Sequence, residues 1–315
     1  MRDKCLKVIK TFLECHHVDR RPIVLAISGG SDSMALLELM QASKQFFPLD
    51  LHVAHVDHGF RDESADEAKQ LQDLIDLPFY MTRLDPQQRV GNLEDWARDQ
   101  RYQFFAKIAK EVGAQAVMVA HHLGDQAETV LKRVLEGAQL VKLGSIAPET
   151  IINGVKVWRP LLPLQKKELE AWLKGRFVND PMNQDPKYLR ARMRETILPS
   201  LEAQFGKSID GSLGRIAMRS QDLKDYLDRR VIPYLSALEE GEIDFKPFYP
   251  LEKIEVIHFL SNLASSLGQV LTYAQLETLF HLLATKSPKK QIQSGDLLFQ
   301  CHLGYLSVDK VKSMC

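Results

Sequence analysis

The residues nearest the amino terminus whose types suggest chemistry form a short loop of small side chains. The loop reads SGGSDS, from Ser28 to Ser33, and lies between an apolar run and a helical pattern. Its two glycines remove side chains where backbone must approach phosphate oxygens, its serines add hydroxyl donors, and the following helix start contributes a positive dipole end. It is not a Walker A loop, since no Gly-Lys-Ser/Thr follows, nor a dinucleotide fingerprint, since a third glycine is missing. A helix cap with Asp32 in the first turn is the structural alternative to a phosphate loop.

A second candidate group lies where two carboxylates fall one helical turn apart. Asp125 and Glu128 follow an apolar run in the segment AHHLGDQAETVLKR, close to His121 and His122. A carboxylate pair at the carboxyl end of a strand is a natural receptor for an ammonium or a metal ion. The two histidines alone are more typical of supporting or core groups.

Two further segments place charged residues where a ligand could meet them. Asp57 and His58 belong to the segment VDHGFR at the end of an apolar run, where a turn into a helix is an equally simple explanation. Glu94, Arg98 and Arg101 recur on one face of a predicted helix. A solvated, self-paired helix face also explains such a row, so the position of these residues in the fold must decide.

The elements that position these groups alternate between strand and helix patterns from Pro22 to about Val157. Short apolar, β-branched runs predict strands at 23–27, 51–56, 79–84, 116–121 and 155–158. Amphipathic stretches between them begin near Ser31, Asp62, Asn92 and Gly124. Stacked βαβ units predict a doubly wound, Rossmann-like parallel α/β sheet, which binds ligands at the carboxyl ends of its strands.

The pattern changes after Trp158, and a second domain is expected. Helical periodicity returns at 212–238 and 251–283, and the residues 297–308 alternate like a small hairpin. We therefore predict a catalytic domain over residues 1–205 and a smaller, mainly helical domain over residues 206–315.

Five motifs in this order, SGGSDS, VDHGFR, NxExxAR, AHHxxDQxET and RPLL, resemble those of the tRNA(Ile)-lysidine synthase family over roughly the first 200 residues. The first motif is similar to the pyrophosphate loop (PP-loop) of the N-type ATP pyrophosphatases, which cut ATP between its α and β phosphates and transfer AMP. The resemblance implies an AMP-forming ligase that uses ATP and Mg²⁺ to adenylate O2 of the wobble cytidine of tRNA(Ile) with a CAU anticodon. L-lysine would then attack C2 and expel AMP, which gives lysidine.

The same resemblance assigns roles to individual residues. ATP would be held by Ser28, Gly29, Gly30, Ser31, Asp32, Ser33, Asp57 and His58. Asp125 and Glu128 would hold the substrate lysine, and Asp32 would bind Mg²⁺, which prefers hard oxygen ligands. The predicted catalytic residues are Asp32, Arg101 and Asp125. A fixed guanidinium such as Arg101, with Arg98 behind it, suits developing phosphate charge.

Two positions depart from the family's pattern. Gln139 stands where glycine is common after the DQxET motif, and Ala191 replaces the asparagine of an RNxxR pattern that here is RARMR. These changes concern the substrate loop and RNA contact rather than the ATP chemistry.

Basic residues that could contact RNA concentrate between Lys156 and Arg194, where ten basic side chains face four acidic ones. Such a patch supplies affinity for phosphates without recognising sequence. The predicted tRNA contacts are Arg176, Lys187, Arg190, Arg192 and Arg194.

The composition limits the remaining choices. The chain has 41 basic and 41 acidic residues, so affinity for RNA has to come from a local patch. Its four cysteines lie near the two ends without a CxxC pair, which argues against a zinc ribbon, an iron-sulfur site or a disulfide framework. We expect no signal peptide and no membrane span, and hence a cytoplasmic protein. The sequence leaves open whether it acts as a monomer or as a homodimer.

Other functions are compatible with parts of this pattern. A tRNA thiolase with the same loop would need catalytic or cluster cysteines, and relatives such as GMP or NAD synthetases would need an ammonia source; neither feature is visible. A nucleotide-regulated tRNA-binding protein without catalysis is the alternative from another class. Turnover of ATP to AMP distinguishes it from an enzyme.

Overall fold

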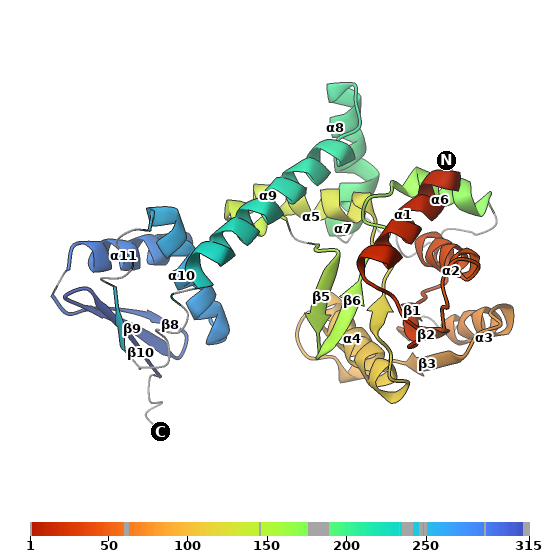
Figure 1. Cartoon of the computed structure of the whole chain (residues 1–315), viewed down its shortest axis with the longest axis horizontal. Coiled ribbons are helices and arrows are strands. Elements are labelled where there is room, and N and C mark those ends of the chain that lie inside the picture. Colours follow the sequence, from red (N-terminus) through yellow and green to blue (C-terminus); the bar gives the residue numbers. More distant parts are fainter. Residues whose placement is uncertain are drawn as a thin grey trace. The chain divides into compact units, whose positions relative to one another are not determined.

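The computed structural model describes residues 2–59, 63–144, 146–175, 189–232, 234, 242–245, 248, 251–286 and 288–310. The chain divides into two compact units. The first unit comprises Met1–Glu136 and Gly144–Ala217, and the second comprises Gly137–Leu143 and Met218–Cys315. Figure 1 follows the elements of both units along the sequence.

The first unit is built on a six-stranded sheet with the order β3-β2-β1-β4-β6-β5. Its strands are β1 (Ile23–Ala26), β2 (Leu51–Asp57), β3 (Phe79–Arg83), β4 (Ala116–Met118), β5 (Glu149–Ile152) and β6 (Val155–Trp158). All neighbours pair in parallel except β5, which runs antiparallel to β6 at the edge. In the centre, Leu25 pairs with Val53 on one side and Met118 on the other. The predicted doubly wound parallel sheet is thus confirmed.

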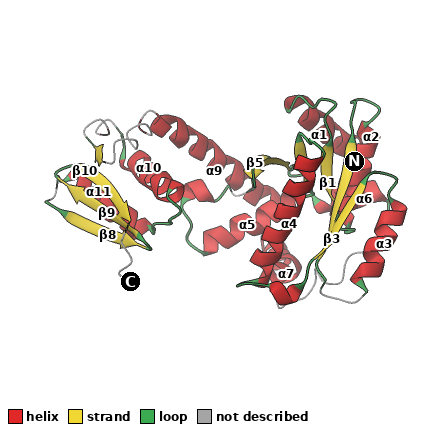
Figure 2. Cartoon of the chain, turned by 90° about the horizontal axis from the view of Figure 1, so that it is seen from below, coloured by secondary structure: helices red, strands yellow, loops and turns green. Residues whose placement is uncertain are grey.

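Helices cover both faces of this sheet (Figure 2). They are α1 (Arg2–Cys15), α2 (Ser31–Ser43), α3 (Ser64–Leu74), α4 (Leu93–Glu111) and α6 (Lys166–Leu173). The helix α5 (Leu123–Leu135) belongs to the same unit but to neither of the two cores beside the sheet. Because successive strand residues point to opposite faces, Leu25 packs in one core with α1, α2, α3 and α6, whereas Val24 packs in another with Phe105 of α4. Burial on both faces explains the continuous apolar runs of the central strands.

The last helices of the first unit follow one another closely along the chain. They are α7 (Leu189–Arg192), a π-helical turn η4 (Met193–Ile197), α8 (Leu198–Phe205) and the first part of α9 (Asp210–Val231). A small core joins α5 to this region through Val130, Leu198 and Leu213. The helix α5 therefore packs against α8 and the first part of α9.

The second unit packs helices against an antiparallel sheet with the order β7-β10-β9-β8. Its elements are α10 (Lys253–Ser266), α11 (Tyr273–Ala284), β7 (Glu242–Asp244), β8 (Lys290–Ser294), β9 (Leu297–His302) and β10 (Tyr305–Lys310). The predicted hairpin is β9 and β10. The helical stretch predicted at 251–283 is two helices, because Gly268 has a φ of +78° just after α10 and the Thr272 hydroxyl caps α11.

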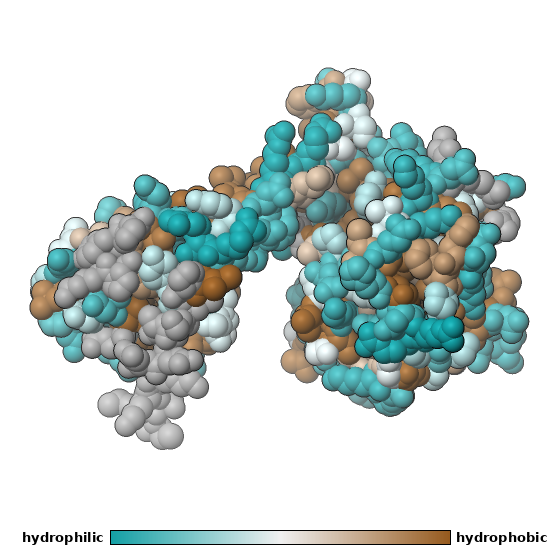
Figure 3. All heavy atoms as spheres, in the orientation of Figure 1, coloured by the Kyte–Doolittle hydropathy of each residue, from teal (hydrophilic) through white to brown (hydrophobic). Residues whose placement is uncertain are grey.

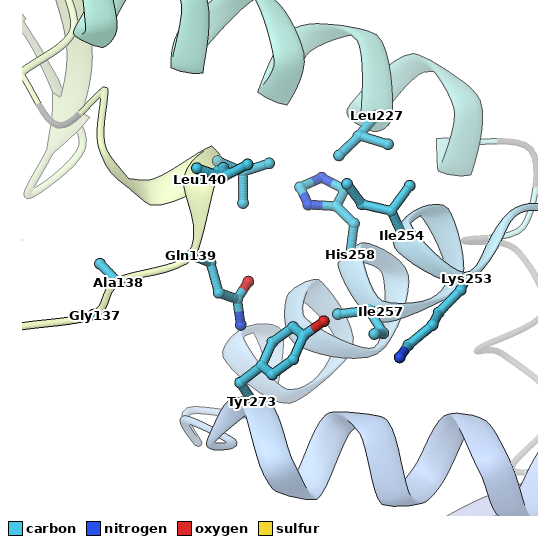
Figure 4. A pocket seen from close by; sticks show the side chains of 11 residues that line it. Gly137, Ala138, Gln139, Leu140, Leu227, Lys253, Ile254, Ile257, His258 and Tyr273 are labelled. Atoms are coloured by element: carbon cyan, nitrogen blue, oxygen red, sulfur yellow. The ribbon is translucent and has the colours of Figure 1, made fainter. Parts of the chain in front are cut away.

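The second unit contains a pocket of about 520 Å³. Its apolar walls come from α9, α10 and the segment Gly137–Leu143, and His258 and Tyr273 face that segment (Figure 4). The Nε2 atom of His258 lies 2.6 Å from Asp228 Oδ1. Gln139, one of the two departures from the family's pattern, lines this pocket, so the departure falls in the second unit.

Within the described part of the chain, no helix has both the length and the apolar character needed to cross a bilayer. In the view of Figure 3, hydrophilic and hydrophobic side chains are interspersed over the coloured surface of each unit.

Candidate active site

The SGGSDS loop joins β1 to α2 and is braced by its own hydroxyls. The Ser33 hydroxyl donates to the Gly30 carbonyl at 2.8 Å and accepts from the Ser28 N–H at 3.2 Å. Gly29 has a backbone φ of +89°, a conformation that residues other than glycine rarely adopt. The Ser28 hydroxyl lies 3.2 Å from the Ser33 hydroxyl and accepts the Gly30 N–H at 3.4 Å, so both hydroxyls brace the loop, although Ser28 is exposed beside the N-terminus of α2.

The carboxyl ends of β1 and β2 are tied together beside this loop. The Ile27 N–H donates to the Ala54 carbonyl at 3.0 Å, and the Nδ1 atom of His55 lies 2.8 Å from the Ile27 carbonyl. Asp57 ends β2, and its carboxylate accepts the Gly59 N–H at 2.9 Å. Asp57 and the adjacent His58 therefore lie at the same edge of the sheet as the SGGSDS loop. The Asp57 carboxylate also stabilises the turn that follows β2.

The N-terminus of α5 is closed by a reciprocal pair of hydrogen bonds. The Gly124 N–H donates to His122 Nδ1 at 3.0 Å, and the His122 N–H donates to Asp125 Oδ2 at 2.9 Å. A Cβ atom at Gly124 would lie 2.8 Å from the His122 ring, so any larger residue there would displace the ring. Asp125 thus caps its own helix, a structural role that the motif did not predict.

Asp125 and Glu128 do converge, and a guanidinium joins them. Arg194 donates from Nε to Glu128 at 2.7 Å and from Nη2 to Asp125 Oδ1 at 3.1 Å. Burial raises the pKa of Glu128 by more than Arg194 lowers it. Burial would also raise the pKa of Asp125, but His122, His121 and Arg194 bring it below its ordinary value. The pair is a buried anionic site that is stabilised by a cation.

His122 connects this pair to the phosphate loop. Its Nε2 atom lies 3.6 Å from Asp32 Oδ2 and 3.7 Å from Asp125 Oδ2. Burial alone would lower the pKa of His122, but the Asp32 and Asp125 carboxylates raise it above its ordinary value. The other carboxylate oxygen of Asp32 is buried without a hydrogen-bond partner. One imidazole thus lies between the predicted ATP site and the predicted lysine site.

Positive charge gathers near the α4 helix. The guanidinium carbons of Arg98 and Arg101 lie 4.8 and 5.7 Å from the centre of the Tyr102 ring. Burial lowers the pKa of Arg101, and the charges of Arg98 and Arg190 lower it further. A bound phosphate would relieve this repulsion, so the cluster is suited to an anion.

Arg159, from the RPLL motif, is buried and makes three side-chain hydrogen bonds. It donates to His121 Nδ1 at 3.2 Å, and to the Ala147 carbonyl and the Thr150 hydroxyl at 2.9 Å each. It is 4% exposed, so it does not belong to the surface patch counted between Lys156 and Arg194. Burial, with Arg159, Arg98 and Arg101 beside the ring, lowers the pKa of His121 to about 4.

The predicted tRNA contacts divide into three kinds. Arg190 and Arg192 are exposed on α7. Arg194 turns instead to the two carboxylates. Arg176 and Lys187 lie outside the described residues.

Sequence reasoning missed the pairing of Arg194 with Glu128 and the bridging position of His122. Arg190 and Arg194 are four residues apart, which is the spacing of one helical face, but this spacing does not indicate that Arg194 meets the carboxylates. A partner 66 residues away leaves no local signal in the sequence.

Comparison with known proteins first defines the class. The family described as the PP-loop domain matches residues 2–201. A U34-tRNA thiolase from Methanococcus maripaludis shares the fold, with a TM-score of 0.56 and 18% identity over 71% of this chain and 78% of the thiolase. The first unit is therefore a PP-loop ATP-binding domain.

Curated relatives then define the family. A tRNA(Ile)-lysidine synthase of Protochlamydia amoebophila is 41% identical over 74% of this chain, which spans about half (52%) of that relative. Those of Chlamydia pneumoniae and Chlamydia caviae are 39% and 34% identical and are covered over 69% and 91% of their lengths. The chain belongs to the tRNA(Ile)-lysidine synthase family, as the five motifs predicted.

Proposed function

We propose that the protein ligates L-lysine to C2 of the wobble cytidine of tRNA(Ile) with a CAU anticodon. The reaction passes through a cytidine adenylated on O2 and releases pyrophosphate and then AMP. The observation that supports it best is the link through His122 between Asp32 of the phosphate loop and Asp125 of the carboxylate pair. Such a link supports a nucleotide site and an ammonium site side by side at one edge of the sheet, which is where open α/β sheets bind ligands.

The ATP site would be formed by residues Ser28 to Ser33 together with Asp57 and His58. Mg²⁺ would be held by Asp32, whose buried, unpartnered carboxylate oxygen is a suitable hard ligand. In the described residues no three His, Cys, Asp or Glu side chains form a metal site, so phosphates and water would complete the coordination, as is usual for Mg²⁺. When bound, the ion would neutralise charge on the phosphates.

The lysine site would be the carboxylate pair. An ammonium would be held by Asp125 and Glu128, and Glu128, whose pKa is raised by burial, can accept the proton that the attacking amine must lose. Arg101, set among other arginines, would stabilise negative charge on the adenylate.

The tRNA would reach this site from the side of Arg190 and Arg192. We propose that residues 1–205 carry the chemistry and residues 206–315 bind the tRNA, in the cytoplasm. Light scattering at assay concentrations distinguishes a monomer from a homodimer.

Incorporation of labelled lysine into an unmodified tRNA(Ile) transcript tests this function. With ATP, the wild type should transfer lysine and release AMP, while the Asp125→Asn and Glu128→Gln variants should lose transfer by about a hundredfold or more. A transcript with another base at the wobble position should accept no lysine. AMP release without lysine transfer would keep the PP-loop chemistry but refute lysine as the acceptor.

A further inference from the structure

The carboxylate pair proposed to hold lysine is already paired with a cation of the chain itself. Both hydrogen bonds come from one guanidinium, that of Arg194, at 2.7 Å to Glu128 and 3.1 Å to Asp125. The side chains of Glu128 and Asp125 are only 6% and 23% exposed. The guanidinium therefore occupies the position that a substrate ammonium would need.

The two cations compete for the same oxygens. Asp125 offers Oδ1 to Arg194, while its Oδ2 accepts the backbone N–H of His122. Glu128 offers Oε1 to Arg194 and has little exposed surface for a second cation. Two like charges within hydrogen-bond distance of one carboxylate pair repel each other. We propose that Arg194 is a placeholder for the substrate ammonium, and that lysine binds only when Arg194 leaves the pair.

The segment that carries Arg194 also reaches the arginine cluster. Arg190 lies one helical turn earlier, is exposed, and is near enough to Arg101 for its charge to lower the pKa of that guanidinium. A tRNA phosphate that binds at Arg190 would contact the same short segment that holds Arg194 in the lysine site. RNA binding and lysine binding are thereby coupled through one element.

The local backbone of this segment interrupts the regular α-helical pattern. Arg194 lies in the π-helical turn Met193–Ile197, between α7 and α8. A π-turn carries one residue more than the α-helical turn it interrupts, and such turns are common at functional sites. Conversion of the turn to α-helix would re-aim Arg194, so that the placeholder leaves while α8 stays in place. Lysine would then enter after the tRNA.

This inference rests on the proposed function, and equilibrium dialysis of labelled lysine tests it. Without tRNA, Arg194→Gln should bind lysine about 10- to 100-fold more tightly than the wild type, since a charge-assisted hydrogen bond no longer competes. Arg215→Gln, at an exposed arginine of α9, is the matched control and should not change lysine binding. Addition of the tRNA(Ile) transcript should tighten lysine binding to the wild type but not to Arg194→Gln.

A folded Arg194→Gln variant that binds lysine no more tightly than the wild type would overturn the placeholder. If that variant does not fold, Arg194→Lys keeps the positive charge but cannot make both hydrogen bonds with the same geometry. It should then bind lysine more tightly than the wild type, by a smaller factor than expected for Arg194→Gln. Equal lysine affinity of the wild type with and without tRNA would also overturn it. Failure of the wild type to transfer lysine to tRNA would refute the proposed function instead, so the two failures are distinguishable.

Discussion

His121 provides a quantitative prediction about the stability of the first unit. Burial, with three arginines nearby, lowers its pKa from 6.5 to about 4. Below pH 6.5 the unfolded chain takes up a proton that the folded protein does not, so this contribution is complete above pH 6.5 and is lost as the pH falls toward 4. Each pH unit below 6.5 in that window lowers the free energy of unfolding by about 1.4 kcal/mol, so the loss at pH 5 is on the order of 2 kcal/mol.

Urea unfolding at pH 7.5 and pH 5 measures this loss. The three tryptophans, Trp96, Trp158 and Trp172, all belong to the first unit, so their fluorescence follows its unfolding alone. The His121→Asn variant should be less sensitive to acid than the wild type by about 2 kcal/mol between the two pH values. His302→Asn, in the second unit, replaces a histidine elsewhere and is the control. An equal loss of stability in wild type and His121→Asn would refute the reasoning.

Three further substitutions test other parts of the site. Gly29→Ala should lower the free energy of unfolding in urea by about 1–3 kcal/mol and raise the KM for ATP, because a φ of +89° is strained for alanine. Gly30→Ala, at a φ of −71°, should lower the free energy of unfolding by less. Equal losses in the two variants would contradict the geometry. Arg101→Lys should lower kcat about a hundredfold in steady-state transfer assays with little change in the KM for lysine; a change confined to KM would move Arg101 out of the chemical step. Arg159→Lys should destabilise the first unit by about 2–4 kcal/mol in tryptophan-monitored unfolding, since a lysine cannot reproduce three hydrogen bonds; a loss below 1 kcal/mol would contradict this.

The parallel sheet was predictable because its strands are buried on both faces. Apolar side chains with strand periodicity then appear as continuous runs, as in β1 and β2. The edge strand β5 was missed because its solvent side carries an apolar residue, Ile151, which is 72% exposed. The alternation of polar and apolar residues that indicates a strand is therefore weak there. In the second unit, β8 is largely polar and exposed, and only the more apolar β9 and β10 were predicted.

The loop and the carboxylate pair were predictable for a different reason. Each is a local motif at the carboxyl end of a strand, and parallel strands bring such ends to one edge. The partners that complete the site come from elsewhere in the chain, such as Arg194 for Glu128 and Arg159 for His121. Their pairing depends on how helices and loops pack, so no spacing in the sequence could indicate it.

The stoichiometry of nucleotide and lysine tests the central claim most directly. Purified protein, ATP, lysine and the CAU tRNA(Ile) transcript should yield AMP, pyrophosphate and tRNA-bound lysine in equal amounts, with the lysine on the wobble cytidine in mass spectra of the digested RNA. Omission of the transcript should abolish AMP formation. Production of ADP, or lysine attached at any other nucleotide, would contradict the proposed function.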